Sequence, residues 1–238
     1  MIILRTSAKV TSRLICFAHA GGGASFFRPW ARSLPDHIEL CAVQLPGREN
    51  LYTDRLLESF EDVMEFILPR LSSLTELPYA FFGHSFGGLV AFEAARRLSI
   101  KERPPSLLAL SSTRAAFLPN LRRLSSLPDA ELLKSISDLG GVSASALQIR
   151  ELMQLTLPII RADFACIEGY VRPTADVKIE IPIWACGGVA DPWVDTQSLG
   201  AWSRHAGSSF KIRLYPGGHF YILENHDALI SEIVAIFS

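Results

Sequence analysis

The sequence predicts an α/β fold with a mostly parallel central sheet and helices on both of its faces. Short, nearly all-apolar runs recur along the chain, and helical patterns separate most of them. Strands that are apolar on both faces are typical of parallel sheets, which helices cover on both sides. With 238 residues, of which 49% are hydrophobic, the chain is long enough to bury a large core in a single domain over residues 1–238.

The expected strands and helices alternate along the chain. Strand-like runs occur at 14–18, 38–43, 79–82, 107–110, 181–186 and 210–214. Apolar residues at helical spacing predict helices at 60–71, 89–98, 196–202 and 228–237. This alternation predicts strands that lie parallel to one another in one sheet.

The interval from Thr113 to Pro173 breaks the alternation. It lies between two expected strands and contains only helix-like segments, at 129–139, 144–156 and 158–170, with Gly140 and Gly141 as a break. One interpretation is extra packing for the sheet. A position at the carboxyl edge of the strands favours another, a helical lid insertion at about 113–173 whose apolar faces line an acyl pocket.

Charge and hydropathy exclude several classes of partner. The formal net charge is −1 and no basic run occurs, so we expect no nucleic-acid partner. No stretch approaches the roughly 18 apolar residues of a membrane span, and the apolar segment at residues 1–5 is too short for a secretory signal. We therefore expect a cytoplasmic protein with no membrane partner, and a monomer.

The four cysteines are expected to be structural. Cys16, Cys41 and Cys186 lie in strand-like runs and Cys166 in a helical one. Their spacing is not that of a metal site, and reduced, buried thiols are typical of a cytoplasmic protein. We expect neither a metal ion nor a cofactor.

The pentapeptide Gly83-His84-Ser85-Phe86-Gly87 is the most informative motif. It follows the strand-like run at 79–82 and precedes the helix expected at 89–98. A serine in such a sharp strand-to-helix turn is a nucleophile elbow, and its glycines let the strand and the helix approach each other. Chance supplies the pattern G-x-S-x-G in roughly one such chain in ten, so the strand before it and the helix after it carry the assignment. Ser85 is therefore predicted to be the nucleophile of a hydrolase or an acyltransferase.

A serine hydroxyl needs a base that accepts its proton and an acid that orients the base. Of the six histidines, only His205, His219 and His226 follow the insertion. His219 lies in the glycine-rich loop at 216–220, directly after the last expected strand, from which an imidazole can point back across the sheet edge. His205 and His226 adjoin helix ends and are expected at the surface, so His219 is the predicted base.

Asp191 is the predicted acid, because it lies in the loop after the strand at 181–186. An aspartate before a proline is also typical of a turn or a helix cap, which is the alternative interpretation. Asp195 is better explained as the cap of the next helix.

The negative charge that develops on the attacked carbonyl oxygen needs two backbone donors. The N–H of Phe86, the residue after the nucleophile, is the first. The loop His19-Ala20-Gly21-Gly22-Gly23 follows an early strand, and its glycines allow close approach to a substrate, so the N–H of Ala20 is the second. A phosphate-binding loop is disfavoured here because no Lys-Ser or Lys-Thr pair follows.

Four segments together resemble the type II thioesterase family. They are His19-Ala20-Gly21-Gly22, Gln44-Leu45-Pro46-Gly47-Arg48-Glu49, Gly83-His84-Ser85-Phe86-Gly87-Gly88 and Pro216-Gly217-Gly218-His219-Phe220. Their order and spacing are those of the family, and the similarity extends to residues 157–164 in the insertion. Members of this family are stand-alone α/β-hydrolases associated with polyketide and nonribosomal peptide synthetases.

The resemblance implies an α/β-hydrolase fold with Ser85, Asp191 and His219 as the catalytic triad, and Ala20 and Phe86 as the oxyanion hole. Ala18 departs from the pattern, since proline commonly precedes the histidine in relatives, which leaves the composition of the oxyanion loop open.

Three further polar residues of the motifs are His19, His84 and Arg48. His19 and His84 are expected to shape their loops rather than act as bases. The segment 44–49 has three interpretations: a plain turn, a loop anchored by Arg48, or a contact of Arg48 with an acidic carrier protein.

By the same resemblance, the protein hydrolyses acyl thioesters on the phosphopantetheine arm of acyl or peptidyl carrier proteins, through an acyl-Ser85 intermediate and without a cofactor. It would thereby remove stalled or wrongly loaded acyl groups. The triad alone is equally compatible with a small carboxylesterase or an acyl-CoA thioesterase. A non-catalytic binding protein with the same fold is the remaining alternative.

Overall fold

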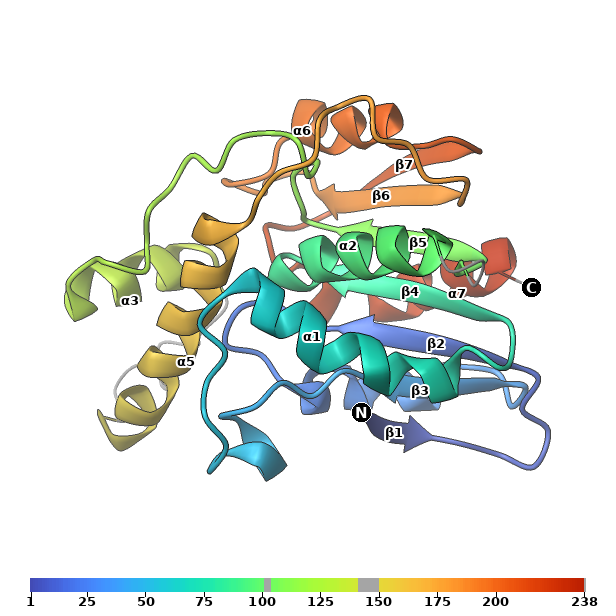
Figure 1. Cartoon of the computed structure of the whole chain (residues 1–238), viewed down its shortest axis with the longest axis horizontal. Coiled ribbons are helices and arrows are strands. Elements are labelled where there is room, and N and C mark those ends of the chain that lie inside the picture. The colour runs from blue at the N-terminus through green and yellow to red at the C-terminus, as the bar shows by residue number, and fades with distance from the viewer. Residues whose placement is uncertain (101–103, 141–149, 238) are drawn as a thin grey trace.

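The structure is a computed structural model that describes residues 1–100, 104–140 and 150–237. Within these ranges a seven-stranded sheet forms the centre, in the order β1-β3-β2-β4-β5-β6-β7 (Figure 1). The strands are β1 (Ile2–Arg5), β2 (Ser12–Phe17), β3 (Ile38–Ala42), β4 (Tyr79–His84), β5 (Leu107–Ser111), β6 (Ile183–Gly188) and β7 (Phe210–Tyr215). All neighbours run parallel except β1 and β3, so the expected mostly parallel sheet is confirmed.

Strand β1 was not predicted from the sequence. It pairs antiparallel with β3 at the edge of the sheet, with Ile2 opposite Ala42. Ile2 and Leu4 pack against the core on one face of the sheet, whereas Ile3 points to the opposite face and is 55% exposed. The run is apolar but only four residues long, which is too short to be recognised as a strand from the sequence alone.

Helices cover both faces of the sheet (Figure 1). On one face, α1 (Phe60–Leu71), α2 (Phe86–Ile100) and α6 (Thr196–Gly200) share a core with the strands. On the other face lie α7 (His226–Phe237) and the 3₁₀ segment Ala24–Arg32, and the latter was not predicted. The expected helix at 60–71 is confirmed, and Ser59 begins it through a reciprocal capping box with Asp62.

The other predicted helices differ at their ends. Helix α2 begins three residues before the expected position, directly after Ser85, and α7 begins at His226. The expected helix at 196–202 is α-helical only to Gly200 and continues as the 3₁₀ turn Ala201–Arg204.

The segment between β5 and β6 contains α3 (Asp129–Asp138) and α5 (Arg150–Gly169) in its described part. The expectation of separate helices on either side of residue 157 was wrong, because α5 runs through Pro158. The apolar face formed by Met153, Leu157 and Ile160 continues across the proline and is buried, whereas Pro158 is exposed. Its missing N–H therefore frees a carbonyl on the solvent side, where water can bind it. Gly141 and residues 144–149 lie outside the described residues.

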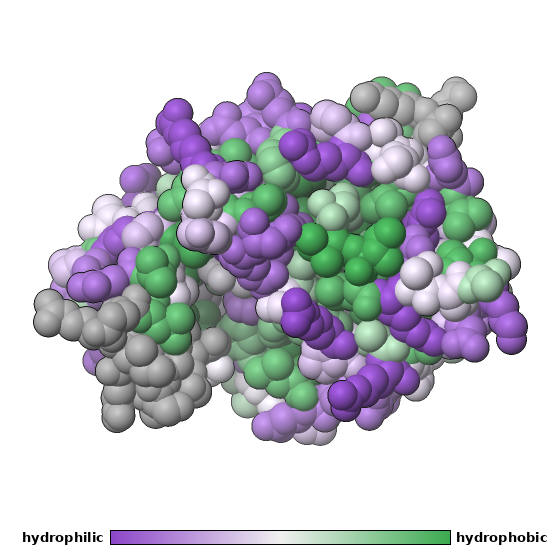
Figure 2. Space-filling view, turned by 90° about the horizontal axis from the view of Figure 1, so that it is seen from below, coloured by the Kyte–Doolittle hydropathy of each residue, from purple (hydrophilic) through white to green (hydrophobic). Residues whose placement is uncertain are grey.

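Among the helices in the described ranges, none combines the length and the apolar character that crossing a membrane requires. Figure 2 shows a face on which hydrophilic and hydrophobic residues are mixed, with a hydrophobic area near its middle. Apolar atoms ordinarily make up more than half of a folded protein's surface, so this area by itself assigns no partner. All four cysteines are buried and unpaired, as expected.

Candidate active site

Ser85 lies in the tight turn that joins β4 to α2. Its φ of 56° is in the left-handed region, which a residue with a side chain seldom adopts. The Ser85 N–H donates to the Ser111 carbonyl at 2.8 Å, and Thr113 Oγ1 donates to the Ser85 carbonyl at 2.8 Å. These bonds to the end of β5 and the residues after it hold the turn in its unusual conformation.

Two glycines make this turn sterically possible. A Cβ atom on Gly83 would lie 2.2 Å from the Gly87 carbonyl oxygen, and one on Gly87 would lie 2.1 Å from the Phe17 carbonyl oxygen. Both distances are far inside van der Waals contact, and both neighbours are backbone atoms. The strand, turn and helix can thus approach this closely only without side chains at these positions.

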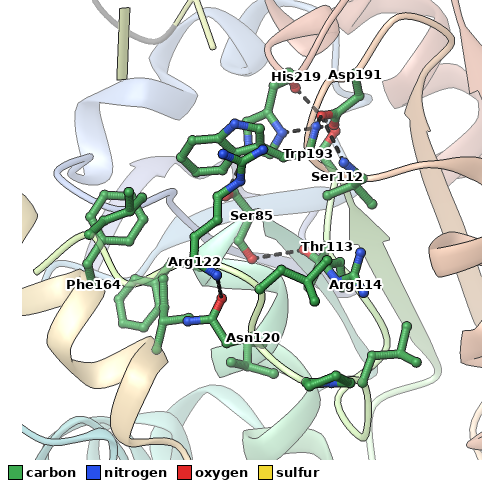
Figure 3. A pocket seen from close by; sticks show the side chains of 18 of the residues that line it. Ser85, Ser112, Thr113, Arg114, Asn120, Arg122, Phe164, Asp191, Trp193 and His219 are labelled. Atoms are coloured by element: carbon green, nitrogen blue, oxygen red, sulfur yellow. Dashed lines mark hydrogen bonds and ion pairs between the residues drawn. The ribbon is translucent and has the colours of Figure 1, made fainter. Parts of the chain in front are cut away.

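The structure brings Ser85, His219 and Asp191 together, as Figure 3 shows. His219 Nε2 lies 3.0 Å from Ser85 Oγ, and His219 Nδ1 lies 2.8 Å from Asp191 Oδ2. Ser85, Asp191 and His219 follow β4, β6 and β7, which run in the same direction. The carboxyl ends of these strands meet at one edge of the sheet, so residues 28 and 134 positions from His219 become its neighbours.

Both interpretations of Asp191 hold at once. Its Oδ1 accepts the backbone N–H groups of Trp193 at 2.9 Å and Val194 at 3.1 Å, as in a turn, while Oδ2 faces His219. Burial acts to raise the pKa of Asp191, but the hydrogen bond from His219, the charge of a protonated His219 and the Trp193 N–H outweigh it and keep that pKa below its usual value. The carboxylate is therefore ionised at neutral pH and fixed in orientation.

The other two late histidines lie elsewhere. His205 was expected at the surface, and this was wrong: it is completely buried, with Nδ1 2.6 Å from the Val177 carbonyl oxygen and its ring against Phe92 and Trp202. The 3₁₀ turn before it directs the ring inward, which a pattern of helix ends does not reveal. His226 is half-buried at the first residue of α7, and Asp195 caps α6 through the Ser198 N–H at 2.7 Å, as predicted.

The backbone groups predicted to bind the oxyanion flank Ser85. Phe86 is the first residue of α2, where an N–H has no partner within the helix. Throughout the described ranges, the N–H groups of Phe86 and Ala20 donate to no protein acceptor. Ala20 and Ser85 line one cavity, and Phe86 and Ser85 line another. Both donors are thus free for a ligand.

Arg48 anchors the loop that contains Ala20. Its guanidinium group forms two hydrogen bonds with the Asp163 carboxylate, at 2.7 and 2.8 Å, and donates to the Gly22 carbonyl at 3.1 Å. Asp163 Oδ2 also accepts the Gly21 N–H at 2.7 Å. Because Arg48 is only 5% exposed, it cannot contact the surface of a carrier protein. The structure selects the anchoring interpretation among the three.

His84 is buried and His19 is half-buried beside this loop. Burial, followed by the charges of His219 and Arg48, lowers the pKa of His19 to about 3. Burial also places the pKa of His84 well below its usual value, and its Nδ1 lies 2.9 Å from Ser111 Oγ. The His19 ring packs edge-on against Phe26 and Phe220. Both imidazoles are neutral at pH 7 and act as packing groups, in agreement with the expectation that they shape their loops.

Ser85 lies where two cavities meet. The larger has a volume of about 540 Å³ and the smaller about 100 Å³. Phe164, Trp193 and His219 line both of them together with Ser85. Residues 118–122 and Leu124 wall the larger cavity, and Ile136, Leu139 and Ile160 wall the smaller one. Residues of the segment between β5 and β6 therefore bound both cavities.

Three residues of the site were not singled out from the sequence. Trp193 lines both cavities, and the guanidinium carbon of Arg122 lies 4.8 Å from the centre of its ring (Figure 3). Asp163 interrupts an apolar helix face, and a carboxylate in such a position is a signal that a buried partner exists. Trp193, in the loop after Asp191, carries no comparable signal. Among the described residues, no cluster of three or more His, Cys, Asp or Glu side chains is arranged to hold a metal ion.

Comparison with known proteins places this geometry in a family. A family model described as a thioesterase domain matches residues 12–237. The chain is 37% identical over 220 residues to the gramicidin S biosynthesis protein GrsT of Aneurinibacillus migulanus, covering 92% of this chain and 86% of that protein. It is 37% identical over 225 residues to the thioesterase PikA5 of Streptomyces venezuelae, covering 93% and 79% of the two chains.

Solved structures agree with the sequence comparisons. The type II thioesterase BorB from the borrelidin biosynthetic cluster matches with a TM-score of 0.90 and 33% identity, covering 100% of this chain and 97% of that one. The RedJ thioesterase from the prodiginine pathway of Streptomyces coelicolor matches with a TM-score of 0.88 and 33% identity, covering 96% and 91%. These matches confirm the α/β-hydrolase fold and the resemblance to type II thioesterases. The chain belongs to the thioesterase family, and it is a hydrolase that acts on thioesters.

Proposed function

We propose that this protein is a type II thioesterase that hydrolyses acyl groups from the phosphopantetheine arm of acyl or peptidyl carrier proteins in polyketide or nonribosomal peptide biosynthesis. One observation carries the proposal: Ser85, His219 and Asp191 form a continuous hydrogen-bonded chain where two cavities meet. The names of the relatives, which include a gramicidin S biosynthesis protein and a type II thioesterase from a borrelidin cluster, support the pathway.

In the proposed mechanism, His219 Nε2 accepts the proton of Ser85 Oγ while this oxygen attacks the thioester carbonyl carbon. Asp191 holds the Nδ1–H and stabilises the imidazolium that forms. The N–H groups of Ala20 and Phe86 bind the oxyanion, and each such donor contributes roughly 3 kcal/mol to lowering the barrier. The carbon–sulfur bond breaks, the sulfur takes the proton from His219, and the arm leaves as a free thiol.

Water completes the cycle in the second half of the reaction. His219 accepts a proton from a water molecule, whose oxygen attacks the carbonyl carbon of acyl-Ser85. The carbon–oxygen bond to Ser85 breaks, Ser85 Oγ regains the proton from His219, and the free carboxylic acid leaves. A thiol, with a pKa near 8.5, is a better leaving group than an alcohol and needs less help from the general acid.

The helical segment at about 113–173 is proposed as a lid on a single domain, residues 1–238. Support comes from the cavity walls, since α3 and α5 bound the smaller cavity and residues 118–122 the larger one. We also propose that the protein is a monomer and acts in the cytoplasm. Its four buried, unpaired cysteines support a reducing compartment.

A panel of substrates tests the function. The same acyl groups would be presented on a carrier protein, on coenzyme A and as simple esters, with the products followed by intact mass. The expected result is fastest turnover on the carrier protein and none by Ser85→Ala. Equal or faster turnover of the esters would contradict the carrier assignment and favour a carboxylesterase. Failure of a fluorophosphonate to label Ser85 would exclude a serine hydrolase altogether.

A further inference from the structure

The larger cavity beside Ser85 contains cationic side chains that the proposed mechanism does not use. Arg114 and Arg172 line it, and both are half-buried. Arg114 follows Thr113 directly, and Figure 3 shows it next to that residue, close to Ser85. Across the described parts of the chain, neither arginine forms an ion pair with a carboxylate. Two charges at the same cavity are thus without a direct counter-ion.

The contacts that these guanidinium groups do make leave donors unused. Arg114 Nη1 donates to Ser198 Oγ at 2.9 Å, while its Nε–H is buried and has no partner in the described structure. Arg172 Nη1 donates to the Ala116 carbonyl at 3.2 Å. A guanidinium group has five N–H donors, so each arginine keeps Nη donors that no protein acceptor uses in the described structure.

Within the described ranges, the acidic groups at this cavity form no direct ion pair with the two arginines. Asp191 is bound to His219, and Asp195 accepts the Ser198 N–H at the start of α6, from where its charge attracts Arg114. Arg122 adds a third positive charge at the cavity. Burial lowers the pKa of Arg172, and the nearby charge of Arg114 lowers it further, against an opposite effect of Tyr170. A bound anion would relieve this repulsion and satisfy the free donors.

We infer that Arg114 and Arg172 form a subsite for a carboxylate at the free end of the acyl chain, so that the enzyme accepts acyl groups derived from dicarboxylic acids. This inference rests on the proposed thioester hydrolysis. A carboxylate and a phosphate are both bound well by paired guanidinium groups. The phosphate of the arm is joined to the carrier protein and stays near its surface, whereas Arg114 directly follows Thr113, whose hydroxyl binds the Ser85 carbonyl. This proximity to Ser85 favours the acyl carboxylate.

Binding to Ser85→Ala tests the subsite independently of turnover. The ligands are the glutaryl thioester and its terminal amide, which has the same size without the charge, both on N-acetylcysteamine and on 4′-phosphopantetheine. Calorimetry is expected to show about ten- to hundred-fold tighter binding of the carboxylate than of the amide, as for hydrogen bonds to a charged group. The ratio of the two affinities is expected to be the same on 4′-phosphopantetheine, which carries a phosphate, as on N-acetylcysteamine, which does not.

Substitutions in the same background assign the effect to the two arginines. Arg172→Gln and Arg114→Gln are each expected to remove most of the preference for the carboxylate, and Arg172→Lys to retain part of it. Binding of the neutral amide reports in each variant whether the cavity is intact. Arg123→Gln is the matched control, since Arg123 is an exposed neighbour on the same loop that does not line the cavity.

Two outcomes would overturn the inference. Equal affinity for the acid and the amide would show that no anion subsite exists for the acyl chain. Tighter binding of the 4′-phosphopantetheine thioesters than of the N-acetylcysteamine thioesters, lost in the arginine variants, would show that the two arginines bind the phosphate of the arm instead. If the carboxylate is preferred in binding but the active enzyme hydrolyses neither thioester, the subsite stands and the proposed function fails.

Discussion

Ser85 combines an unfavourable backbone conformation with a complete set of hydrogen-bond partners. A non-glycine residue with positive φ costs roughly 1–3 kcal/mol, and the bonds to Ser111 and Thr113 offset this cost. Asp191 is held equally firmly, because one of its oxygens binds two backbone N–H groups and the other faces His219. The groups of the proposed triad are therefore positioned before any substrate arrives.

Asp191→Asn separates the orienting role of this residue from its role in the turn. The amide oxygen can still accept the N–H groups of Trp193 and Val194, but the amide nitrogen cannot accept the proton of His219 Nδ1–H. We expect kcat to fall by about 10⁴-fold, because the imidazole then adopts the wrong tautomer. Steady-state kinetics and circular dichroism measure the two effects. The exposed Asp176→Asn serves as the control, and a loss of less than tenfold in Asp191→Asn would argue against the triad.

Helix α5 connects the helical insertion to the loop that carries Ala20. Asp163 on this helix binds the Gly21 N–H and the buried Arg48, and the Ile160 side chain occupies the space where a Cβ atom on Gly21 would lie. Gly21 has a φ of +79°, which suits glycine. The position of the Ala20 donor thus depends on a helix more than a hundred residues further along the chain, as the separation of 142 between Gly21 and Asp163 shows.

Substitution of Asp163 is expected to affect both stability and catalysis. Asp163→Asn leaves the Arg48 charge buried without a counter-ion, which costs about 3–5 kcal/mol of unfolding free energy. The double variant Arg48→Met with Asp163→Leu should recover most of that loss. Its kcat should nevertheless stay about tenfold or more below wild type with KM little changed, because the Ala20 donor is no longer held in place.

Denaturant titration and steady-state kinetics on the wild type, Asp163→Asn and the double variant measure these effects. If the double variant recovers wild-type kcat together with stability, Asp163 has only a structural role.

The junction of β4 with α2 offers a matched pair of glycine substitutions. In Gly87→Ala, the new Cβ atom would lie 2.1 Å from the Phe17 carbonyl oxygen, so we expect severe destabilisation of the fold. In Gly200→Ala no atom lies within 4 Å, and Gly200 has helical angles. This second variant should gain about 0.5–1 kcal/mol. Thermal unfolding of both proteins checks the pair, and similar melting temperatures would contradict the close approach of helix and strand.

Three histidines with lowered pKa values influence the stability of the whole molecule. Burial lowers the pKa of His19 to about 3, places that of His84 well below its usual value, and lowers that of His205. Each is neutral in the folded protein but takes up a proton in the unfolded chain once the pH falls below about 6.5. Stability from these groups is therefore complete above about pH 6.5 and is lost as the pH falls toward the folded pKa.

For His19, with a folded pKa of about 3, the unfolding free energy is expected to fall by up to about 1.4 kcal/mol per pH unit between pH 6.5 and 5, and His84 and His205 add to this fall. Denaturant titrations across this range measure the slope. His19→Gln should reduce the slope by the contribution of one histidine. A stability that does not vary over this range would show that these histidines are protonated in the folded state.

Structure formed by residues close together in the sequence was largely predictable, because it depends on the conformations that a few neighbouring residues can adopt. The glycines around Ser85 permit a tight strand-to-helix turn, and the apolar runs of the central strands are recognisable without neighbours. Strand β1 and the path of α5 through Pro158 were missed, because pairing at an edge and packing of a helix face overrode the local pattern. Likewise, burial of His205 depends on the side chains that surround it, which helix ends do not reveal.

From the sequence alone it follows that a serine in a nucleophile elbow is succeeded by an aspartate and a histidine in loops after later strands. Only the tertiary structure decides that their atoms lie 2.8 and 3.0 Å apart, that Arg48 pairs with Asp163 across 115 residues, and that Arg114 and Arg172 share the cavity beside Ser85. The physical reason is that a local motif depends on the conformations open to a few residues. A contact between distant residues depends on the order of the strands and on which faces the packed helices bring together.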